Sequence, residues 1–182
     1  LLEPSMEAHH SALQALVKRA EGGGKRKSKG PVGVTEQEDI LDALYAANEE
    51  TLKAEKQEIQ AVQRPLEELL TKLLVLGVGP PLRHNISQLL CQLYLKGDNI
   101  ALYSCVGKLQ DCLNGKEARN VADPGKVSVL HCLSKLVETF GTQLGSGFQE
   151  SLTIGQKLYK SPNGCVREGA LVMLASYVST CT

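Results

Sequence analysis

One spacing of apolar side chains recurs three times along the chain, each time at the start of a segment with a helical pattern. A basic residue stands near the start of each segment, and these residues, Arg83, Lys126 and Arg167, are 43 and 41 residues apart. Apolar residues follow each of them after three, seven and ten positions: Ile86, Leu90 and Leu93; Val129, Leu133 and Leu136; Ala170, Leu174 and Tyr177. Such steps place the side chains on one face of a helix, and a period of about 40–47 residues is typical of HEAT or armadillo helix-pair arrays.

The composition agrees with helices packed on helices. Of the 182 residues, 42% are hydrophobic but only 4% are aromatic, and Trp is absent. Leu, Val and Ala suit helix packing, whereas a β-sandwich favours β-branched and aromatic residues. We therefore predict an all-α fold, a HEAT/armadillo-like α-solenoid of stacked antiparallel helix pairs with about eight helices.

The first 34 residues differ from the rest of the chain. Residues 5–21 have the pattern of one amphipathic helix, and a run of glycine and basic residues follows at 22–30. Because that run cannot bury an apolar face, we interpret it as a flexible, solvated loop between helices. The alternative is a nuclear or nucleic-acid-associated patch in a generic helical-repeat binding module. The chain thus divides into 1–34, an N-terminal helix and basic loop, and 35–182, the helical repeats.

Within the repeats, the pattern predicts a long helix from Thr35 whose middle is largely exposed and which Pro65 kinks or restarts. Its buried face is expected to include Ile40, Leu41, Leu44 and Tyr45. The later helices are predicted over 81–96, 99–113, 124–140, 148–158 and 165–180. The last one has an apolar face that an array normally covers with a polar capping repeat. We therefore expect a fragment of a longer solenoid, or a chain that ends against a partner.

The residues needed for catalysis or metal binding are not grouped in the sequence. The six cysteines form no Cys-x-x-Cys pair, the four histidines form no His-x-x-x-His pair, and Gly145-Ser146-Gly147 is not a nucleophile elbow. We interpret the cysteines as small core residues in a reducing compartment. The sequence predicts no enzyme, no catalytic, cofactor-binding or metal site, no cofactor and no small-molecule substrate. The formal net charge is zero, so nucleic acid is not an expected partner.

The three basic residues of the repeat are the candidate site residues. A basic side chain at the start of the second helix of each pair can bond a neighbouring turn or acidic residue, which gives a structural ladder along the solenoid. Alternatively, Arg83, Lys126 and Arg167 form a stripe that binds a partner. The ladder is the preferred interpretation.

Four short blocks in order resemble the HEAT repeat-containing protein five family, its plant branch in particular. The blocks are VLGVGPPLRH (75–84), KGDNIALYS (96–104), LGSGFQE (144–150) and VREGA (166–170). The resemblance covers roughly residues 40–182 and does not include the first 35 residues or the basic loop. It implies a very long cytosolic HEAT solenoid, of which this chain is the N-terminal end.

The same resemblance implies a function in membrane trafficking. Family members accompany the clathrin adaptor complex or its accessory proteins at the trans-Golgi network and endosomes, where they contact the membrane only indirectly. They act in endocytosis, protein localisation and endosome-to-Golgi retrograde transport, and plant members affect carbohydrate metabolism. The family supplies no catalytic residue to assign here.

Overall fold

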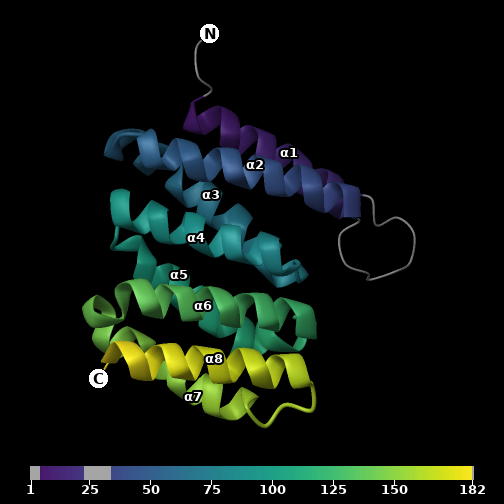
Figure 1. Ribbon diagram of the computed structural model, residues 1–182, viewed down its shortest axis with the longest axis vertical. Helices are drawn as coiled ribbons and strands as arrows, with labels where there is room; N and C mark the ends of the chain where they lie inside the picture. Colours follow the sequence, from purple (N-terminus) through teal and green to yellow (C-terminus); the bar gives the residue numbers. More distant parts are fainter. Residues whose placement is uncertain (1–4, 23–33, 182) are drawn as a thin grey trace.

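The computed structural model describes residues 5–22 and 34–181, which fold into two layers of helices (Figure 1). These residues contain eight α-helices, two short 3-10 helices and no β-strand, which confirms the all-α prediction. The elements are α1 Met6–Gly22, α2 Val34–Lys53, α3 Lys56–Leu76, α4 Pro80–Lys96, α5 Ala101–Asn114, η2 Lys116–Arg119, α6 Asp123–Leu144, η3 Gly145–Phe148, α7 Gln149–Leu158 and α8 Gly164–Cys181. The basic loop predicted at 22–30 lies, beyond Gly22, outside the described residues.

Successive helices alternate between the layers. Helices α2, α4, α6 and α8 lie side by side in one layer, and α3, α5 and α7 lie behind them (Figure 1). Helix α1 packs against both α2 and α3. Each helix of the front layer thus pairs with one behind it, and the pairs stack in chain order from α1 to α8. This is the arrangement of an α-solenoid of antiparallel helix pairs.

The period found in the sequence reappears as a common register. Helices α4, α6 and α8 begin at Pro80, Asp123 and Gly164, so each basic residue of the repeat is the fourth residue of its helix. The apolar residues that follow in α4 and α6 are all fully buried. In α8, Ala170 is buried, whereas Leu174 and Tyr177 are half-buried because α8 is the last helix of the stack.

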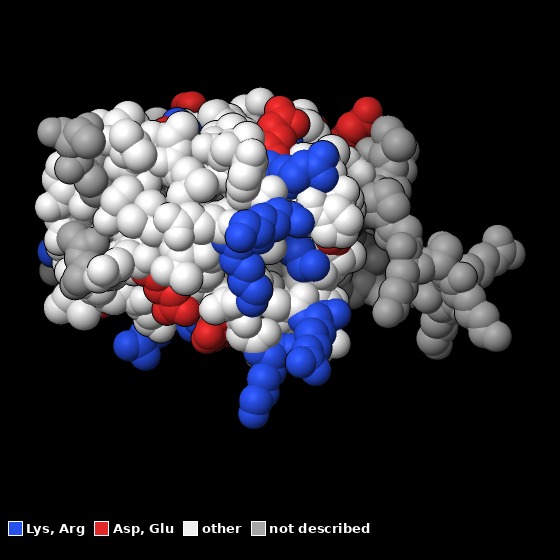
Figure 2. Space-filling view, turned by 90° about the horizontal axis from the view of Figure 1, so that it is seen from below, with Lys and Arg blue, Asp and Glu red and all other residues white. Residues whose placement is uncertain are grey.

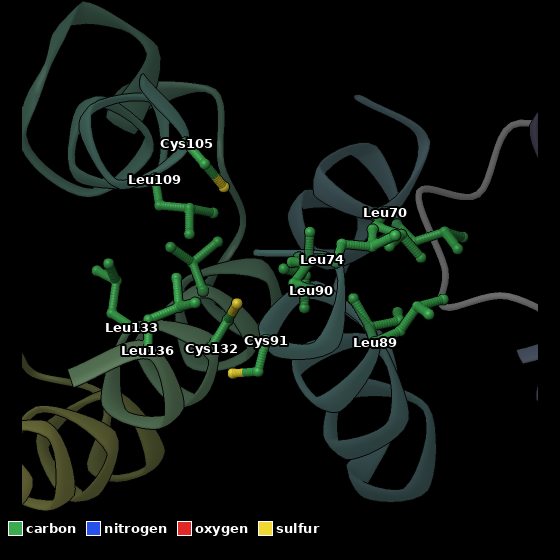
Figure 3. Packing of buried hydrophobic residues seen from close by; sticks show 14 of the residues in the cluster. Leu70, Leu74, Leu89, Leu90, Cys91, Cys105, Leu109, Cys132, Leu133 and Leu136 are labelled. Carbon is green, nitrogen blue, oxygen red and sulfur yellow. The ribbon is translucent and has the colours of Figure 1, made fainter. Parts of the chain in front are cut away.

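The core fills the space between the layers with aliphatic side chains and thiols. Leucines of the pair α3 and α4 lie beside those of the next pair, α5 and α6 (Figure 3). Each such side chain contributes about 1.5–3 kcal/mol on burial. Four cysteines are buried, namely Cys91, Cys105, Cys112 and Cys132, and none of them forms a disulfide. Burial raises the pKa of the Cys105 thiol to about 12 and that of Cys132 well above its ordinary value, so both remain protonated. Cys165 is exposed, which corrects its assignment to the core.

The prediction of one long helix kinked at Pro65 is wrong. The chain breaks at Ala54 and Glu55 instead, and α3 runs without interruption through Pro65. Glu55 caps α3 in a capping box, in which its backbone N–H donates to Glu58 Oε2 at 3.0 Å. Pro65 is exposed, so water can satisfy the carbonyl that its missing N–H leaves free. This break lets α2 join the front layer while α3 joins the back.

The predicted buried face of α2 also needs one correction. Ile40 and Leu44 are fully buried and Leu41 is half-buried, but Tyr45 is 52% exposed. The chain buries Ala47 and Asn48 in α2 instead, and the Asn48 amide donates to the backbone oxygen of Asn85 in α4 at 3.3 Å. Contact with α4 therefore turns Tyr45 toward solvent.

A buried carboxylate links the two layers and gives a first testable prediction. The Glu67 side chain is 5% exposed, and its oxygens accept from the Tyr94 hydroxyl at 2.8 Å and from Lys108 Nζ at 2.9 Å. Tyr94→Phe keeps the ring but leaves one carboxylate oxygen without its donor, so we expect a loss of about 1–3 kcal/mol in the free energy of unfolding. Urea denaturation measures it. Tyr103→Phe is the control, because Tyr103 is exposed; equal effects of the two variants would contradict the prediction.

Candidate functional site

The three basic residues of the repeat lie on the same layer but bond differently. Lys126 Nζ lies 3.4 Å from Asp123 Oδ1 in its own helix. Arg167 Nη1 donates to the carbonyl oxygens of Ser161 and Pro162, at 2.9 and 3.0 Å, in the turn before α8. The Arg83 guanidinium has no hydrogen-bond partner among the described residues. Each of the two bonded side chains thus stabilises its own helix start, and their use as a partner stripe stays a prediction.

One of the three does join a network between neighbouring helix pairs. Asn163, in the turn before α8, donates from Nδ2 to Asp123 Oδ2 at 2.9 Å, and Asp123 is also the partner of Lys126. Asn163 Oδ1 accepts from the backbone N–H groups of Cys165 and Val166 and caps α8. Asn directly before a helix start is a capping signal that can be seen in the sequence.

Buried polar side chains make further contacts between adjacent helix pairs. The hydroxyls of Ser134 in α6 and Ser176 in α8 lie 2.6 Å apart. In the back layer, Gln110 of α5 donates to Ser151 Oγ of α7 at 2.9 Å. These contacts, with Asn48 to Asn85, were missed in the sequence, where the only signal is a polar residue within an otherwise apolar helix face. They fix the register between neighbouring pairs, because a shifted helix would leave buried polar atoms unpaired.

A small cavity of about 200 Å³ lies where the starts of α4, α6 and α8 meet. Arg83, His131, Cys165 and Glu168 contribute polar side chains to its lining. The His131 ring lies 6.1 Å from that of His84, and its Nε2 is buried without a hydrogen-bond partner in the described part of the chain. Burial lowers the pKa of His131, and the positive charges of Arg83, His84 and Lys135 lower it further.

The lowered pKa of His131 predicts a loss of stability in mild acid. Since the folded chain binds this proton less readily than the unfolded chain, the free energy of unfolding should fall as the pH drops below the ordinary pKa of 6.5. Urea denaturation at pH 7.5 and 5.5 measures this, and His131→Gln should weaken the pH dependence of the free energy of unfolding.

A second group, Glu138, titrates outside this pH range. Its pKa is lowered despite its partial burial, by hydrogen bonds from Lys135 and Ser176. The stability that the ionised Glu138 contributes is therefore lost only at lower pH, below about 4.5. An unchanged pH dependence in His131→Gln would contradict the assignment.

Two uncovered apolar surfaces lie on the front layer. The first, the α2–α4 surface, consists of Tyr45 and Leu52 on α2 and Leu95 on α4, which are 52%, 54% and 61% exposed. Tyr45 and Leu52 lie seven residues apart, on one face of the helix. Lys96 Nζ donates to the carbonyl oxygens of Thr51 and Leu52, so the end of α4 lies next to that turn of α2. Such patches are typical of protein interaction sites.

The second surface lies on the end of the stack and consists of Leu171, Val172 and Val178 of α8, all exposed. Figure 2 shows this end of the molecule, on which a broad area without charged residues adjoins a group of Lys and Arg side chains.

Two other kinds of site are absent from the described part of the chain. Within residues 5–22 and 34–181, no three His, Cys, Asp or Glu side chains are grouped so that they could hold a metal ion. No helix in the same part of the chain combines the length and the apolar character needed to span a bilayer.

Comparison with known proteins identifies relatives of the chain, among them a plant protein. The chain is 32% identical over 146 residues to Protein SWEETIE of Arabidopsis thaliana. The aligned region is 79% of this chain but only 6% of that protein. No model of a known protein family and no solved structure matches the chain. The match confirms the resemblance to the plant branch that the four sequence blocks predicted.

Proposed function

The chain belongs to the SWEETIE-like family of HEAT-repeat-type proteins, and from that membership we propose that it is part of a non-enzymatic scaffold in clathrin-adaptor-linked membrane trafficking. Family membership is the observation that carries this proposal. The stacked helix pairs support it, because they build an extended surface from short repeats rather than a single enclosed site.

The proposed partners are the clathrin adaptor complex or its accessory proteins. The scaffold would act on the cytosolic side of the trans-Golgi network and endosomes, and reach the membrane only through these proteins. Endocytosis, protein localisation and endosome-to-Golgi retrograde transport are the processes expected to depend on it. Effects on plant carbohydrate metabolism would then follow from missorted cargo.

The α2–α4 surface is the proposed contact for a protein partner. Its three side chains are large, apolar and exposed, so a partner that covers them gains the free energy of their burial. They lie on two adjacent helices of one layer, so that a partner contacts two helix pairs at once. Scaffolds built from repeats use such surfaces that span several repeats.

Affinity capture of the full-length protein tests the proposal. We expect the wild-type protein to recover clathrin adaptor subunits and Leu52→Asp/Leu95→Asp to recover at least about tenfold less, since central apolar contacts are each worth 2 kcal/mol or more. Tyr159→Asp is the control, because Tyr159 is exposed at the other end of the stack. Recovery of no adaptor subunit by the wild type, with normal cargo sorting after depletion, would refute the scaffold.

Salt-sensitive nucleic-acid binding that is lost on deletion of residues 22–30 would favour the nuclear alternative instead.

A further inference from the structure

A basic cavity of about 840 Å³ lies where the end of α5, the η2 turn, the start of α6 and the end of α7 meet. Lys116 and Arg119 of η2, Lys126 of α6 and Lys157 of α7 all line it. No acidic residue is among its described lining residues. Side chains far apart in the sequence thus bring four positive charges around one space.

Neighbouring groups offset only part of the positive charge of these four side chains. Asp123 offsets Lys126, and at 3.4 Å the pair is loose. The C-terminal ends of α5 and α7 each carry about half a negative charge, so together they offset about one further positive charge. Among the described lining side chains the charges of Lys116, Arg119 and Lys157 have no acidic partner, and this net positive charge favours an anion.

The hydrogen-bonding groups of the lining side chains are almost all donors. Besides the four cations, the only polar side chain among the described lining residues is that of Asn114, whose Oδ1 already accepts from Lys157 Nζ at 2.7 Å. A peptide ligand brings backbone N–H groups that need acceptors, whereas phosphate groups offer mainly acceptor oxygens. The planar guanidinium of Arg119 can bind two such oxygens at once. The set of donors therefore favours a phosphorylated ligand over an acidic peptide.

The size and walls of the cavity indicate a small molecule with several phosphates. A volume of about 840 Å³ is within the usual range for small-molecule sites, about 300–1,000 Å³. Leu113, Ala118 and Leu158 give it apolar walls that can pack against a carbon skeleton. The four cations come from three separate elements and together carry more positive charge than one phosphate group neutralises, since a phosphate carries about −1.5 to −2. We propose that this cavity binds a polyphosphorylated small molecule, such as an inositol polyphosphate, either free or as the headgroup of a lipid.

Titration calorimetry of the 182-residue chain with inositol hexakisphosphate tests the proposal. We expect one site per chain, and an affinity at least about tenfold lower in Lys116→Gln/Arg119→Gln, since charge-assisted hydrogen bonds are lost. The matched control is Lys56→Gln/Arg64→Gln, which removes two exposed cations of α3 outside the cavity. It should leave the affinity unchanged, and the melting temperature of each variant shows that the fold is kept.

Two further probes separate the sources of the ligand. Co-sedimentation with vesicles that contain phosphatidylinositol 4-phosphate, but not with vesicles of phosphatidylserine, would assign the cavity to a lipid headgroup. Binding of the soluble probe alone would assign it to a free polyphosphate. The proposal is overturned if the soluble probe does not bind, if both double variants lose affinity equally, or if a Glu-rich peptide binds more tightly at the same cations. None of these outcomes depends on adaptor capture, so this proposal and the scaffold can fail separately.

Discussion

Gly77→Ala is expected to destabilise the stack by about 2–5 kcal/mol, from left-handed backbone strain and overpacking together. Gly77 ends α3 with φ of 83°, a conformation that costs a residue with a Cβ atom about 1–2 kcal/mol. A Cβ atom there would lie 2.7 Å from Pro124 Cβ and 2.9 Å from the backbone nitrogen of Gly125. Since the end of α3 packs directly on the start of α6, neither side can move without shifting a helix.

Gly107→Ala is the matched control for this prediction. Gly107 lies inside α5, and a Cβ atom there would meet nothing within 4 Å. Ala in a helix interior is about 0.5–1 kcal/mol more favourable than Gly, so this variant should be slightly more stable than the wild type. Urea denaturation of both variants gives the comparison. A Gly77→Ala variant as stable as the wild type would contradict the close packing of α3 on α6.

Substituting equivalent leucines of the repeat by Ala should lower the free energy of unfolding by different amounts, according to the place of each helix in the stack. Leu90 in α4 and Leu133 in α6 are fully buried, whereas Leu174 at the same position of α8 is only half-buried. We expect Leu90→Ala and Leu133→Ala each to cost about 2–5 kcal/mol, through lost burial and the cavity left behind. Leu174→Ala should cost less than about 2 kcal/mol, because part of its side chain is already in water.

The free energy of unfolding of the three variants, measured by denaturant titration, tests the shared register. Leu171→Ala provides a baseline, because Leu171 is an exposed leucine of the same last helix. Equal losses for Leu133→Ala and Leu171→Ala would mean that the repeat positions are not the ones that face the core. A larger loss at Leu174 than at Leu133 would contradict the placing of α8 at the edge of the layer.

The fold could be predicted from the sequence because its main signal is local and repeated. Apolar residues at steps of three and four, on a period of 43 and 41 residues, specify which helix faces are buried and which helices are equivalent. The start of α4 was also predictable, since Pro80 and Pro81 directly follow Gly79, the residue before the helix, and proline suits the first turn.

The parts that were predicted wrongly depend on contacts between helices. The pattern around Pro65 suggested a break there, but a capping box at Glu55 ends the preceding segment earlier, and an exposed proline is tolerated in α3. Tyr45 follows the apolar stripe of α2, yet α4 covers the Asn48 side of that helix. Periodicity alone cannot tell which of two neighbouring faces the next helix will cover.

The candidate surfaces were the least predictable part. The basic residues of the repeat were visible in the sequence, but Arg167 bonds Ser161 and Pro162 in a turn whose position sequence spacing does not give. The basic cavity was not predicted at all, because Lys116 and Lys157 are 41 residues apart and only the stacking of α7 beside α5 brings them together. A binding surface on a repeat fold is a property of the stack rather than of one segment.

Cross-linking of Ser134→Cys/Ser176→Cys tests most directly that helices one repeat apart lie side by side in register. The two serine hydroxyls lie 2.6 Å apart in the core between α6 and α8, so cysteines there are close enough for a disulfide. With the exposed Cys165 replaced by serine, mild oxidation of the folded chain should give an intramolecular 134–176 disulfide, identified by peptide mass spectrometry, and the yield should collapse in denaturant. Free thiols at both positions in the folded chain, or equal yields in the folded and unfolded chain, would contradict the stacked-repeat account.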